Sequence, residues 1–477
     1  MTKKLYWILI LCLFAGHAWG ALSASTIFEV NQAGSSNTNG ACFVEGSSGT
    51  DNTYPTPTVT TYTDLVAVTA TTITSVAFPF DANSPGRCLR ITSGTGWTTG
   101  LYYIVSQLAG TATVDRAIAV MGSTGGNGKS GGALATVGQL NTDMCSGCRA
   151  YVKADATYVI AAKISFNYSN ALPTFIEGYT TMRGDNGKPT VQTSASLGDR
   201  MFDMGVTGGK FTFRNFIIDI NNQASTTGLL SFGPQTEENL EIINFVTATF
   251  GALAFFGQGG ICSNCYIHDG TTTGSVVIFV DSGNICTSCT IRNVAGNGAV
   301  AFEMRRSLCS YCVVDTMTGT NADGFQAENV GSAWTIDHCA VYNVTRDNIR
   351  ITNVAFPGQV TNCVFSGGVN GINNTSGTTL RVGDFYNDYN FTFGVSGSAV
   401  LGLTAGTHSV TLGADPFTDA STHTFTLNNA AGGGAAVTNA GSPSSLPGVT
   451  GTGFPAGGVL QPTVAASVAG GGSVVIP

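Results

Sequence analysis

A repeating order of apolar and polar positions runs through the middle of the chain, from about Phe211 to Phe365. It aligns as seven copies of one short phrase, in which side chains at positions minus three, zero and plus two are mostly apolar. The two residues between positions minus three and zero are mostly polar. Because alternate residues of a strand face the same side, this order predicts a strand, a sharp corner and a second strand. Position zero holds Phe216, Phe245, Cys265, Cys289, Cys312, Cys339 and Cys363.

The corner and the repeat length indicate how the copies are arranged. The second corner residue is asparagine in four of the seven copies, and asparagine tolerates a left-handed backbone. The five copies with a cysteine at position zero are 24, 23, 27 and 24 residues apart. Repeats of this length stack as supersecondary units into a solenoid. Further strands are predicted after the turns at Asp323-Gly324, Asp347-Asn348 and Asn370-Gly371.

Stacked parallel strands, coils of about 24 residues and corner asparagines resemble the right-handed parallel β-helix superfamily, the pectate-lyase-like folds. The resemblance covers roughly Cys145 to Asn390 and rests on the repeat, with no active-site motif. A second resemblance is to secreted and phage-associated β-helix proteins of uncharacterised function, and it implies no chemistry. It rests on Glu177-Gly178-Tyr179, Arg183-Gly184-Asp185, Asp415-Pro416-Phe417 and Leu427-Asn428-Asn429.

Changes in pattern along the chain predict the domain boundaries. Residues 62–120 hold short β-branched and aromatic runs between turn residues, which is typical of a small antiparallel β domain. Residues 121–144 have the composition of a Gly-rich linker, and residues 145–390 are the predicted β-helix. Residues 391–477 are expected to form a few strands and a tail rich in Gly, Ala, Ser and Pro. No segment has a clear 3.6-residue apolar period, so we expect little helix.

The first 20 residues have the organisation of a secretory signal. Two lysines precede the apolar run from Leu5 to Phe14, and Ala18-Trp19-Gly20 has small residues in the place of a signal-peptide cleavage region. The apolar run is short for a membrane span, and no later stretch approaches one. The sequence therefore predicts a signal peptide over residues 1–20, an extended lead-in over residues 21–61, and a secreted protein, extracellular or on a cell surface.

The composition of the chain limits the classes of molecule that it is expected to bind. Only 10% of residues are charged and the net charge is −8, so the chain has no basic footprint for nucleic acid. No sequence motif for a nucleotide, a hydrolase nucleophile or a calcium loop is present, and no cofactor is predicted. Polysaccharide or cell-surface glycan is the expected partner, and a homo-oligomer is possible.

Thirteen cysteines raise the question of disulfides, metal or redox chemistry. Twelve remain without the signal, and an even number in an exported chain favours an oxidised framework, with Cys42 and Cys88 as one candidate pair. Equivalent residues on adjacent coils lie about 4.8 Å apart, which suits a disulfide between coils, and closure across a corner or buried thiols also remain open.

Zinc is the competing interpretation, because several pairs have the spacing of two intervening residues. However, Phe, Ile and Val occupy the same positions in other copies, so these cysteines are core residues first and no metal is predicted. The structural ladder consists of Cys262, Cys265, Cys286, Cys289, Cys309, Cys312, Cys339 and Cys363.

A polar cluster is expected on the outer face of the strands that follow the turns. Register between coils places Asp323 beside Asp347, with Glu328 and Arg350 on the same strands. Paired carboxylates can serve as acid and base in glycoside hydrolysis, and the resemblance to polysaccharide lyases implies that the arginine could abstract a proton. Alternatively, the aspartates only start turns, and Glu328 and Arg350 form a weak surface ion pair. The expected carbohydrate contacts are Glu303, Gln326, Thr352 and Asn373.

Three functions stay open on this basis. The first is a secreted, non-catalytic β-helix that binds polysaccharide, and the lack of a catalytic motif favours it. The second is a polysaccharide lyase or glycoside hydrolase that acts on an acidic glycan. The third is a structural or assembling surface or virion protein.

Overall fold

A computed structural model describes residues 25–33, 35–47, 51–166, 172–204, 210–224, 227–232, 235–247, 252–256, 259–272, 276–280, 283–328, 333–353, 358–377, 385–438 and 440. The predicted signal and residues 441–477 of the predicted tail lie outside this described part. The chain divides into two units, Met1–Thr247 with Ala252–Ile267, and Ala248–Gly251 with His268–Pro477. Within the described ranges, no helix has both the length and the apolar character needed to cross a membrane.

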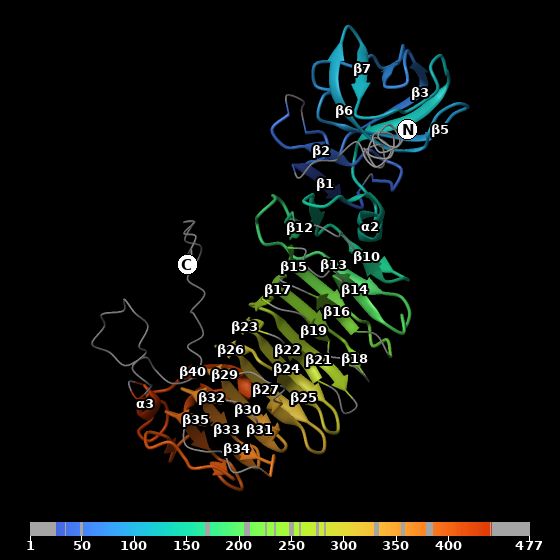
Figure 1. The fold of residues 1–477 in the computed structure, drawn as a ribbon. Helices are drawn as coiled ribbons and strands as arrows, with labels where there is room; N and C mark the ends of the chain where they lie inside the picture. The colour runs from blue at the N-terminus through green and yellow to red at the C-terminus, as the bar shows by residue number, and fades with distance from the viewer. Residues whose placement is uncertain are drawn as a thin grey trace, which may run out of the picture. The chain divides into compact units, whose positions relative to one another are not determined.

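The first unit contains a closed barrel of six short antiparallel strands around a core of aromatic and aliphatic side chains (Figure 1). Tyr62, Leu89, Ile104 and Ile118 are among its buried residues. The strands, in barrel order, are β3 (Val59–Ala67), β4 (Thr72–Thr74), β7 (Thr111–Val114), β6 (Gly100–Leu108), β5 (Cys88–Ser93) and β8 (Gly126–Gly131).

Strand β8 extends the barrel beyond the boundary that the sequence predicts. Gly126–Gly131 was expected within a linker, but it pairs with β3 and β5 and closes the barrel. A Cβ at Gly126 would lie 2.4 Å from Cε2 of Trp97, so the indole packs directly on the strand backbone. Glycine is therefore required by packing, and a glycine run lacks the apolar alternation that signals a strand.

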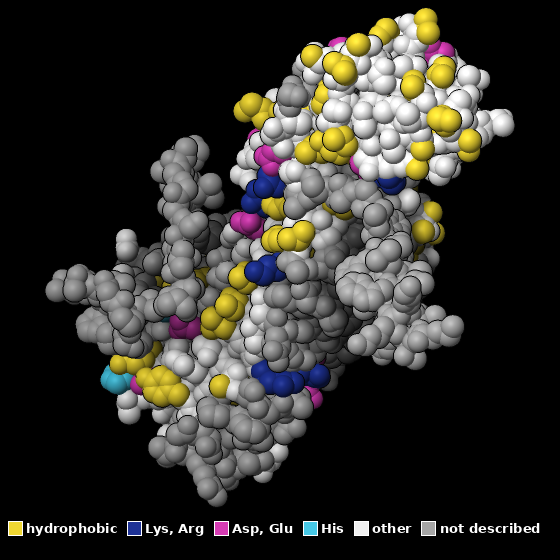
Figure 2. All heavy atoms as spheres, turned by 45° about the horizontal axis from the view of Figure 1, so that its top comes forward, with side chains coloured by type: hydrophobic (Ala, Val, Ile, Leu, Met, Phe, Trp, Pro, Cys, Tyr) yellow, Lys and Arg dark blue, Asp and Glu magenta, His cyan; other side chains and the backbone are white. Residues whose placement is uncertain are grey.

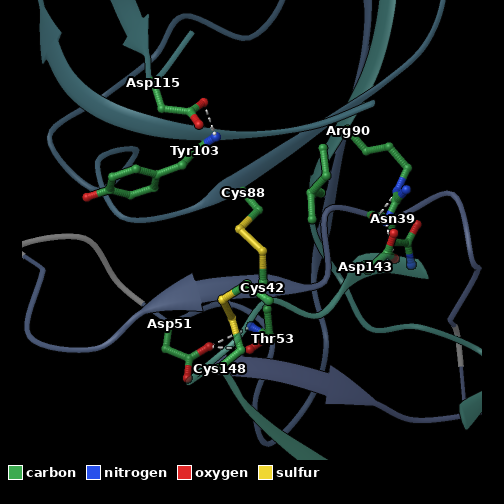
Figure 3. Close-up of a disulfide and its surroundings, with 12 residues drawn as sticks. Asn39, Cys42, Asp51, Thr53, Cys88, Arg90, Tyr103, Asp115, Asp143 and Cys148 are labelled. Atoms are coloured by element: carbon green, nitrogen blue, oxygen red, sulfur yellow. Dashed lines mark hydrogen bonds and ion pairs between the residues drawn. A yellow bond between two sulfur atoms is a disulfide. The ribbon is translucent and has the colours of Figure 1, made fainter. Parts of the chain in front are cut away.

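The lead-in also contributes strands. β1 (Thr26–Val30) pairs antiparallel with β2 (Cys42–Val44) and parallel with β9 (Arg149–Lys153), so it forms part of the solenoid sheet. A disulfide between Cys42 and Cys88, with a Cα–Cα distance of 5.2 Å, joins β2 to strand β5 of the barrel (Figure 3). The pairing proposed for these two cysteines is confirmed.

The segment from Tyr179 to Gly187, which carries part of the second resemblance, is a turn fixed by hydrogen bonds. The Asp185 carboxylate accepts backbone N–H bonds from Thr180, Thr181, Met182 and Gly187. Desolvation raises the pKa of Asp185, but these bonds outweigh it and lower that pKa to about 2. Arg183 donates from Nη2 to the buried Glu29 at 2.9 Å. Hydrogen bonds to the turn backbone and to Glu29 therefore account for the Arg183-Gly184-Asp185 motif.

Parallel strands of the solenoid fill the rest of the first unit. β9 pairs with β12 (Thr174–Tyr179), which pairs with β15 (Phe211–Asp219), which pairs with β17 (Thr236–Ile243). The other elements are η1 (Val137–Gln139), α2 (Leu140–Asp143), β10 (Thr157–Ile160), β11 (Ile164–Ser165), β13 (Thr190–Thr193), β14 (Arg200–Met204), β16 (Thr227–Phe232), β18 (Val246–Thr247), β19 (Leu253–Phe256) and β20 (Ile261–Ser263), and β21 (Tyr266–Thr272) spans the boundary between the units.

The second unit repeats one coil with three strands, and each strand pairs in parallel with its equivalent on the next coil. The predicted parallel β-solenoid is confirmed. The strands before the corner are β23 (Ile285–Thr287), β26 (Leu308–Ser310), β29 (Trp334–Asp337), β32 (Gly358–Thr361) and β35 (Phe385–Asp388). Those after the corner are β24 (Thr290–Ala295), β27 (Val313–Thr318), β30 (Ala340–Val344), β33 (Val364–Ser366), β36 (Phe391–Phe393) and β38 (Val410–Thr411). The third set is β22 (Val276–Val280), β25 (Val300–Met304), β28 (Asp323–Glu328), β31 (Asp347–Asn353), β34 (Asn370–Asn374) and β37 (Val400–Leu401).

The predicted corners are present in all seven copies of the phrase. The residue before position zero has a φ between 52° and 62° in each copy, which is the left-handed region. This is costly for tyrosine or serine in isolation, but the stacked strands on both sides hold the corner in place. The corner residues are Asn215, Asn244, Asn264, Ser288, Tyr311, His338 and Asn362.

A C-terminal segment covers one outer face of the second unit. It comprises β39 (Phe417–Asp419), η2 (Ala420–Thr422), β40 (Thr424–Leu427) and α3 (Gly434–Val437). Phe417, Phe425 and Val437 form a core with residues of position plus one. These are Val313, Ala340, Val364 and Phe391, whereas the same position holds Thr290 one coil earlier. The outer face becomes apolar where the segment covers it.

We expect Phe425→Ala to loosen this segment. Phe425 is 2% exposed and its ring lies 5.2 Å from that of Phe417, so truncation removes about 3 kcal/mol of packing. Amide exchange over residues 417–437 should then accelerate roughly a hundredfold, as read by hydrogen–deuterium exchange mass spectrometry. Val410→Ala, at a residue 41% exposed, is the control that should leave exchange unchanged. Unaltered exchange in the Phe425 variant would contradict the packing role.

Candidate functional site

A column of polar side chains crosses the outer face of the sheet formed by β25, β28, β31 and β34. Glu303 pairs in register with Gln326, Gln326 with Arg350, and Arg350 with Asn373. Successive strands of a parallel sheet are about 4.8 Å apart, so the column presents one polar group at each such step. The register therefore brings these four residues into one row, and we call them the polar column.

The members of the polar column differ in burial and in their contacts with other side chains. Gln326, Arg350 and Asn373 are half-buried, and Glu303 is buried. Arg350 reaches Thr375 Oγ1 from Nε at 3.4 Å, and its Nη1 lies 3.8 Å from Asp323 Oδ2. Within the described residues, the Gln326 amide takes part in no side-chain hydrogen bond. Gln326 and Arg350 therefore offer groups that the fold uses only weakly, whereas Asn373 is held by Asp347 and Glu303 by Arg305.

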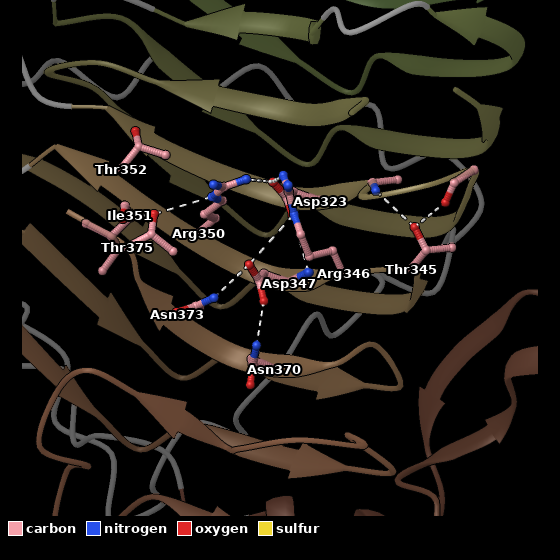
Figure 4. A network of polar contacts seen from close by, with 12 residues as sticks. Asp323, Thr345, Arg346, Asp347, Arg350, Ile351, Thr352, Asn370, Asn373 and Thr375 are labelled. Carbon is pink, nitrogen blue, oxygen red and sulfur yellow. Dashed lines mark hydrogen bonds and ion pairs between the residues drawn. The ribbon is translucent and has the colours of Figure 1, made fainter. Parts of the chain in front are cut away.

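Asp323 and Asp347 lie beneath this face and not on it (Figure 4). Their exposed fractions are 0% and 1%, and Asp323 is in phase with the core residues Phe325 and Ala327. The sequence analysis expected a surface pair, because alternation alone does not show that the first residue of each strand turns inwards. The structure thus buries two of the four residues expected to act in catalysis.

The two aspartates form a buried polar ladder from coil to coil. Asp323 Oδ1 accepts the backbone N–H of Asp347 at 3.2 Å, and Asp347 Oδ1 accepts Asn370 Nδ2 at 2.8 Å. Asn373 Nδ2 donates to Asp347 Oδ2 at 3.0 Å. Buried carboxylates need such partners, because each unpaired polar group in the interior costs stability. The ladder therefore has a structural role.

Arg346 closes the ladder on its solvent side, and the sequence analysis missed it. Its Nε donates to Asp323 Oδ1 at 2.7 Å, and its Nη2 contacts Asp323 Oδ2. Burial raises the pKa of Asp323, and Arg346 opposes that rise. The only sequence signal was an arginine directly before Asp347, in a turn where a charged residue is common.

Glu328 pairs with Arg305 and not with Arg350. Glu328 Oε2 accepts from Arg305 Nε at 3.1 Å and from Nη2 at 2.5 Å. A register shift between Ala327 and Glu328 sets Glu328 opposite Asn353 on the next strand, and Arg350 lies opposite Gln326. The expected Glu328–Arg350 pair is therefore replaced by one with the preceding coil. Thr352, expected beside Glu328, directs its hydroxyl to the Ala327 carbonyl at 3.5 Å.

Glu303 and Glu328 share the same arginine. Glu303 Oε1 lies 2.7 Å from Arg305 Nη2, an ion-pair contact that is not aligned as a hydrogen bond. Burial raises the pKa of Glu303 to about 7, which Arg305 opposes and the neighbouring Glu328 reinforces. Glu303, beside Glu328 and Arg305, is therefore the carboxyl on this face, among the described residues, whose pKa is raised to about 7.

The eight ladder cysteines are buried thiols behind the corners. Position-zero thiols donate to the carbonyl two residues earlier, as in Cys363 to Thr361 at 3.2 Å and Cys339 to Asp337 at 3.3 Å. The remaining such bonds join Cys265 to Ser263, Cys289 to Thr287, and Cys312 to Ser310. The thiol bond is additional, because these carbonyls already accept the backbone N–H of the corner residue on the preceding coil, as Thr361 does from His338 and Asp337 from Tyr311.

Among the described residues of the second unit, one group of thiols could hold a metal ion. The sulfur atoms of Cys286, Cys309 and Cys312 lie within 4.8 Å of one another, and thiolates are ligands of zinc and copper(I).

Charged side chains are sparse over the face seen in Figure 2, as the 10% charged composition leads one to expect.

Comparisons with known proteins concern the fold alone. No protein-family model matches the sequence, and no curated protein matches it. The ORF18 protein of Geobacillus virus E2 is 13% identical, with a TM-score of 0.35 over 58% of this chain and 58% of that chain. Pectate lyase Pel9A is 13% identical, with a TM-score of 0.42 over 69% of this chain and 91% of that chain. The catalytic domain of a GH87 α-1,3-glucanase is 10% identical, with a TM-score of 0.28 over 80% of this chain and 93% of that chain. The parallel β-helix architecture expected from the repeat is present in the stacked coils.

We expect the Glu303 carboxyl to make stability fall as pH rises. Its pKa is raised from 4.5 to about 7 in the folded state, so the folded chain binds more protons than the unfolded chain in that window. Urea unfolding at several pH values measures this effect. Between pH 4.5 and about 7, the free energy of unfolding of the Glu303→Gln variant should fall less than that of the parent chain, by up to about 3 kcal/mol. Burial also raises the pKa of Glu29, to about 8, but Glu29 is present in both proteins and cancels in the comparison.

Glu241→Gln is the matched control, because Glu241 is a partly exposed glutamate whose carboxylate lies 3.9 Å from Lys188. The control should keep the pH dependence of the parent chain. Identical pH dependence for Glu303→Gln and the parent would show that Glu303 titrates normally.

Proposed function

We propose that the chain is an exported β-solenoid that binds an extended polysaccharide along the polar column, without cleaving it. The observation that carries the proposal is the register of Glu303, Gln326, Arg350 and Asn373 on four consecutive strands. A row of hydrogen-bonding groups repeated at about 4.8 Å suits a polymer whose own hydroxyl groups repeat along its length.

The charge on this face favours a glycan with acidic groups. Arg350 is 27% exposed and makes only long contacts with Asp323 and Thr375. A guanidinium can bind a carboxylate with two parallel hydrogen bonds, which gives both affinity and orientation. Gln326 and Asn373 beside it would bind sugar hydroxyls. The disulfide between Cys42 and Cys88 supports an oxidising, extracytoplasmic setting.

Binding without turnover is favoured because the predicted catalytic aspartates are already engaged. Asp323 is held by Arg346, and Asp347 is held by Asn370 and Asn373. Neither carboxylate reaches the surface, so neither can approach a glycosidic oxygen without breaking the ladder. Their arrangement serves the fold.

One observation favours the alternative of a polysaccharide lyase or glycoside hydrolase. Burial raises the pKa of Glu303 to about 7, and a carboxyl that titrates near neutral pH can act as general acid or base. Glu328, which is 33% exposed, would be its partner. On this alternative the chemistry lies with Glu303, one coil before Asp323, and with Glu328, on the same strand as Asp323.

We expect Arg350→Ala to weaken binding of an acidic polysaccharide about tenfold or more, because it removes a charge-assisted hydrogen bond. Affinity electrophoresis of the purified chain in gels that contain acidic or neutral polysaccharides measures this. Arg149→Ala is the control. Arg149 is a 45% exposed arginine that pairs with Glu45, and it is distant in sequence from the polar column. Equal retardation of the Arg350 variant and the parent would rule out the column as the binding face.

The same samples separate binding from catalysis. After long incubation, the binding proposal predicts no new reducing ends and no unsaturated sugar products. Release of either product, abolished by Glu303→Gln and retained by Glu241→Gln, would replace the binding proposal with the enzymatic alternative.

A further inference from the structure

Four corners of the chain carry a cysteine on each side, always three residues apart; three lie between strands of the repeated phrase, and the fourth, Cys145–Cys148, lies between α2 and β9. The residue before the second cysteine has a left-handed backbone in every case. Its φ is 75° at Gly147, 54° at Asn264, 54° at Ser288 and 55° at Tyr311. The four corners therefore have the same length, and the residue with the left-handed backbone stands at the same position in each.

One of these corners is closed by a disulfide. Cys145 and Cys148 are bonded, with their Cα atoms 5.2 Å apart, which lies within the usual range for a disulfide. The other three corners hold thiols. In one of them the sulfur atoms of Cys262 and Cys265 are 3.4 Å apart, and a bonded pair is separated by about 2.05 Å. A modest rotation of the two side chains closes this gap.

We infer that Cys262–Cys265, Cys286–Cys289 and Cys309–Cys312 are oxidation sites that close as corner disulfides when the chain folds in an oxidising compartment. Cys339 and Cys363 stay thiols, because Ile336 and Val360 occupy the partner positions three residues earlier. The inference concerns the scaffold and does not depend on what the polar column binds.

The chemistry requires an oxidant, for which a small-molecule disulfide such as oxidised glutathione is sufficient. Each closure breaks two S–H bonds and forms one S–S bond. The two electrons and the two protons pass to the glutathione disulfide, which leaves as two glutathione thiols. Cys262, Cys265 and Cys286 are at most 2% exposed in the folded chain, so closure takes place before or during folding.

Two other outcomes compete for the same sulfur atoms. Cys312 Sγ is 4.0 Å from Cys286 Sγ on the neighbouring coil, which suits a bond between coils. The cluster of Cys286, Cys309 and Cys312 suits a thiolate-bound zinc or copper(I) ion. Corner closure is favoured because the chain already contains one such closed corner, and because thiolates in an apolar interior leave a buried charge.

The test counts thiols in the full chain. The reduced, denatured chain is refolded in a glutathione redox buffer, denatured again, alkylated and weighed, and its disulfides are mapped on unreduced peptides. Among the twelve cysteines from Cys42 onwards, corner closure predicts five disulfides and two alkylated residues. Eight alkylated residues in a chain whose circular dichroism shows the native fold would overturn the inference.

Valine variants make the assignment specific, since valine already occupies the minus-three position at Val360. Cys262→Val should raise the alkylated count from two to three by releasing Cys265. Cys339→Val should lower it from two to one and serves as the matched control. A peptide that links Cys286 to Cys312, or one equivalent of zinc or copper with the thiols retained, would also overturn corner closure.

Discussion

The parallel stacking of coils at about 4.8 Å is the constraint on which the rest of the structure depends. It converts any residue type that recurs at one position of the phrase into a continuous column. The inward columns are Phe, Ile, Val and Cys, and their burial supplies the stability of the solenoid. The corners make the stacking possible, because one left-handed residue in each copy turns the strand without interrupting the register. The same constraint aligns the polar groups of the outer face, so scaffold and candidate site have one geometric origin.

Sequence reasoning recovered what this periodicity determines. The inward columns and the left-handed corners follow from counting residues along the phrase. It failed where a contact is not periodic. Gly126–Gly131 is a barrel strand that pairs with β3 and β5 without apolar alternation, and Glu328 pairs with Arg305 on the preceding coil. Arg346 could not be identified, because its role depends on a turn that brings it back to the preceding coil.

The buried ladder of Asp323, Asp347 and Asn370 shows how the outer face and the core are coupled. A buried carboxylate is tolerated only when its oxygens are satisfied, and here backbone N–H groups, asparagine amides and Arg346 do this. The ladder also links the strands that carry the polar column, because Asp323 accepts from Asp347 on the next coil and Asp347 accepts from Asn370 on the coil after that. Arg350 and Asn373 contact this ladder from the surface side, which gives them defined positions before any ligand arrives.

The central claim is that the polar column is a binding face for an extended glycan. Hydrogen–deuterium exchange of the full chain, with and without saturating polysaccharide, tests it most directly because it reports the bound region without any substitution. The account predicts protection concentrated in β25, β28, β31 and β34, with the barrel strands β3 to β8 unchanged. Protection confined to the barrel, or to the strands on either side of the corners, would contradict it.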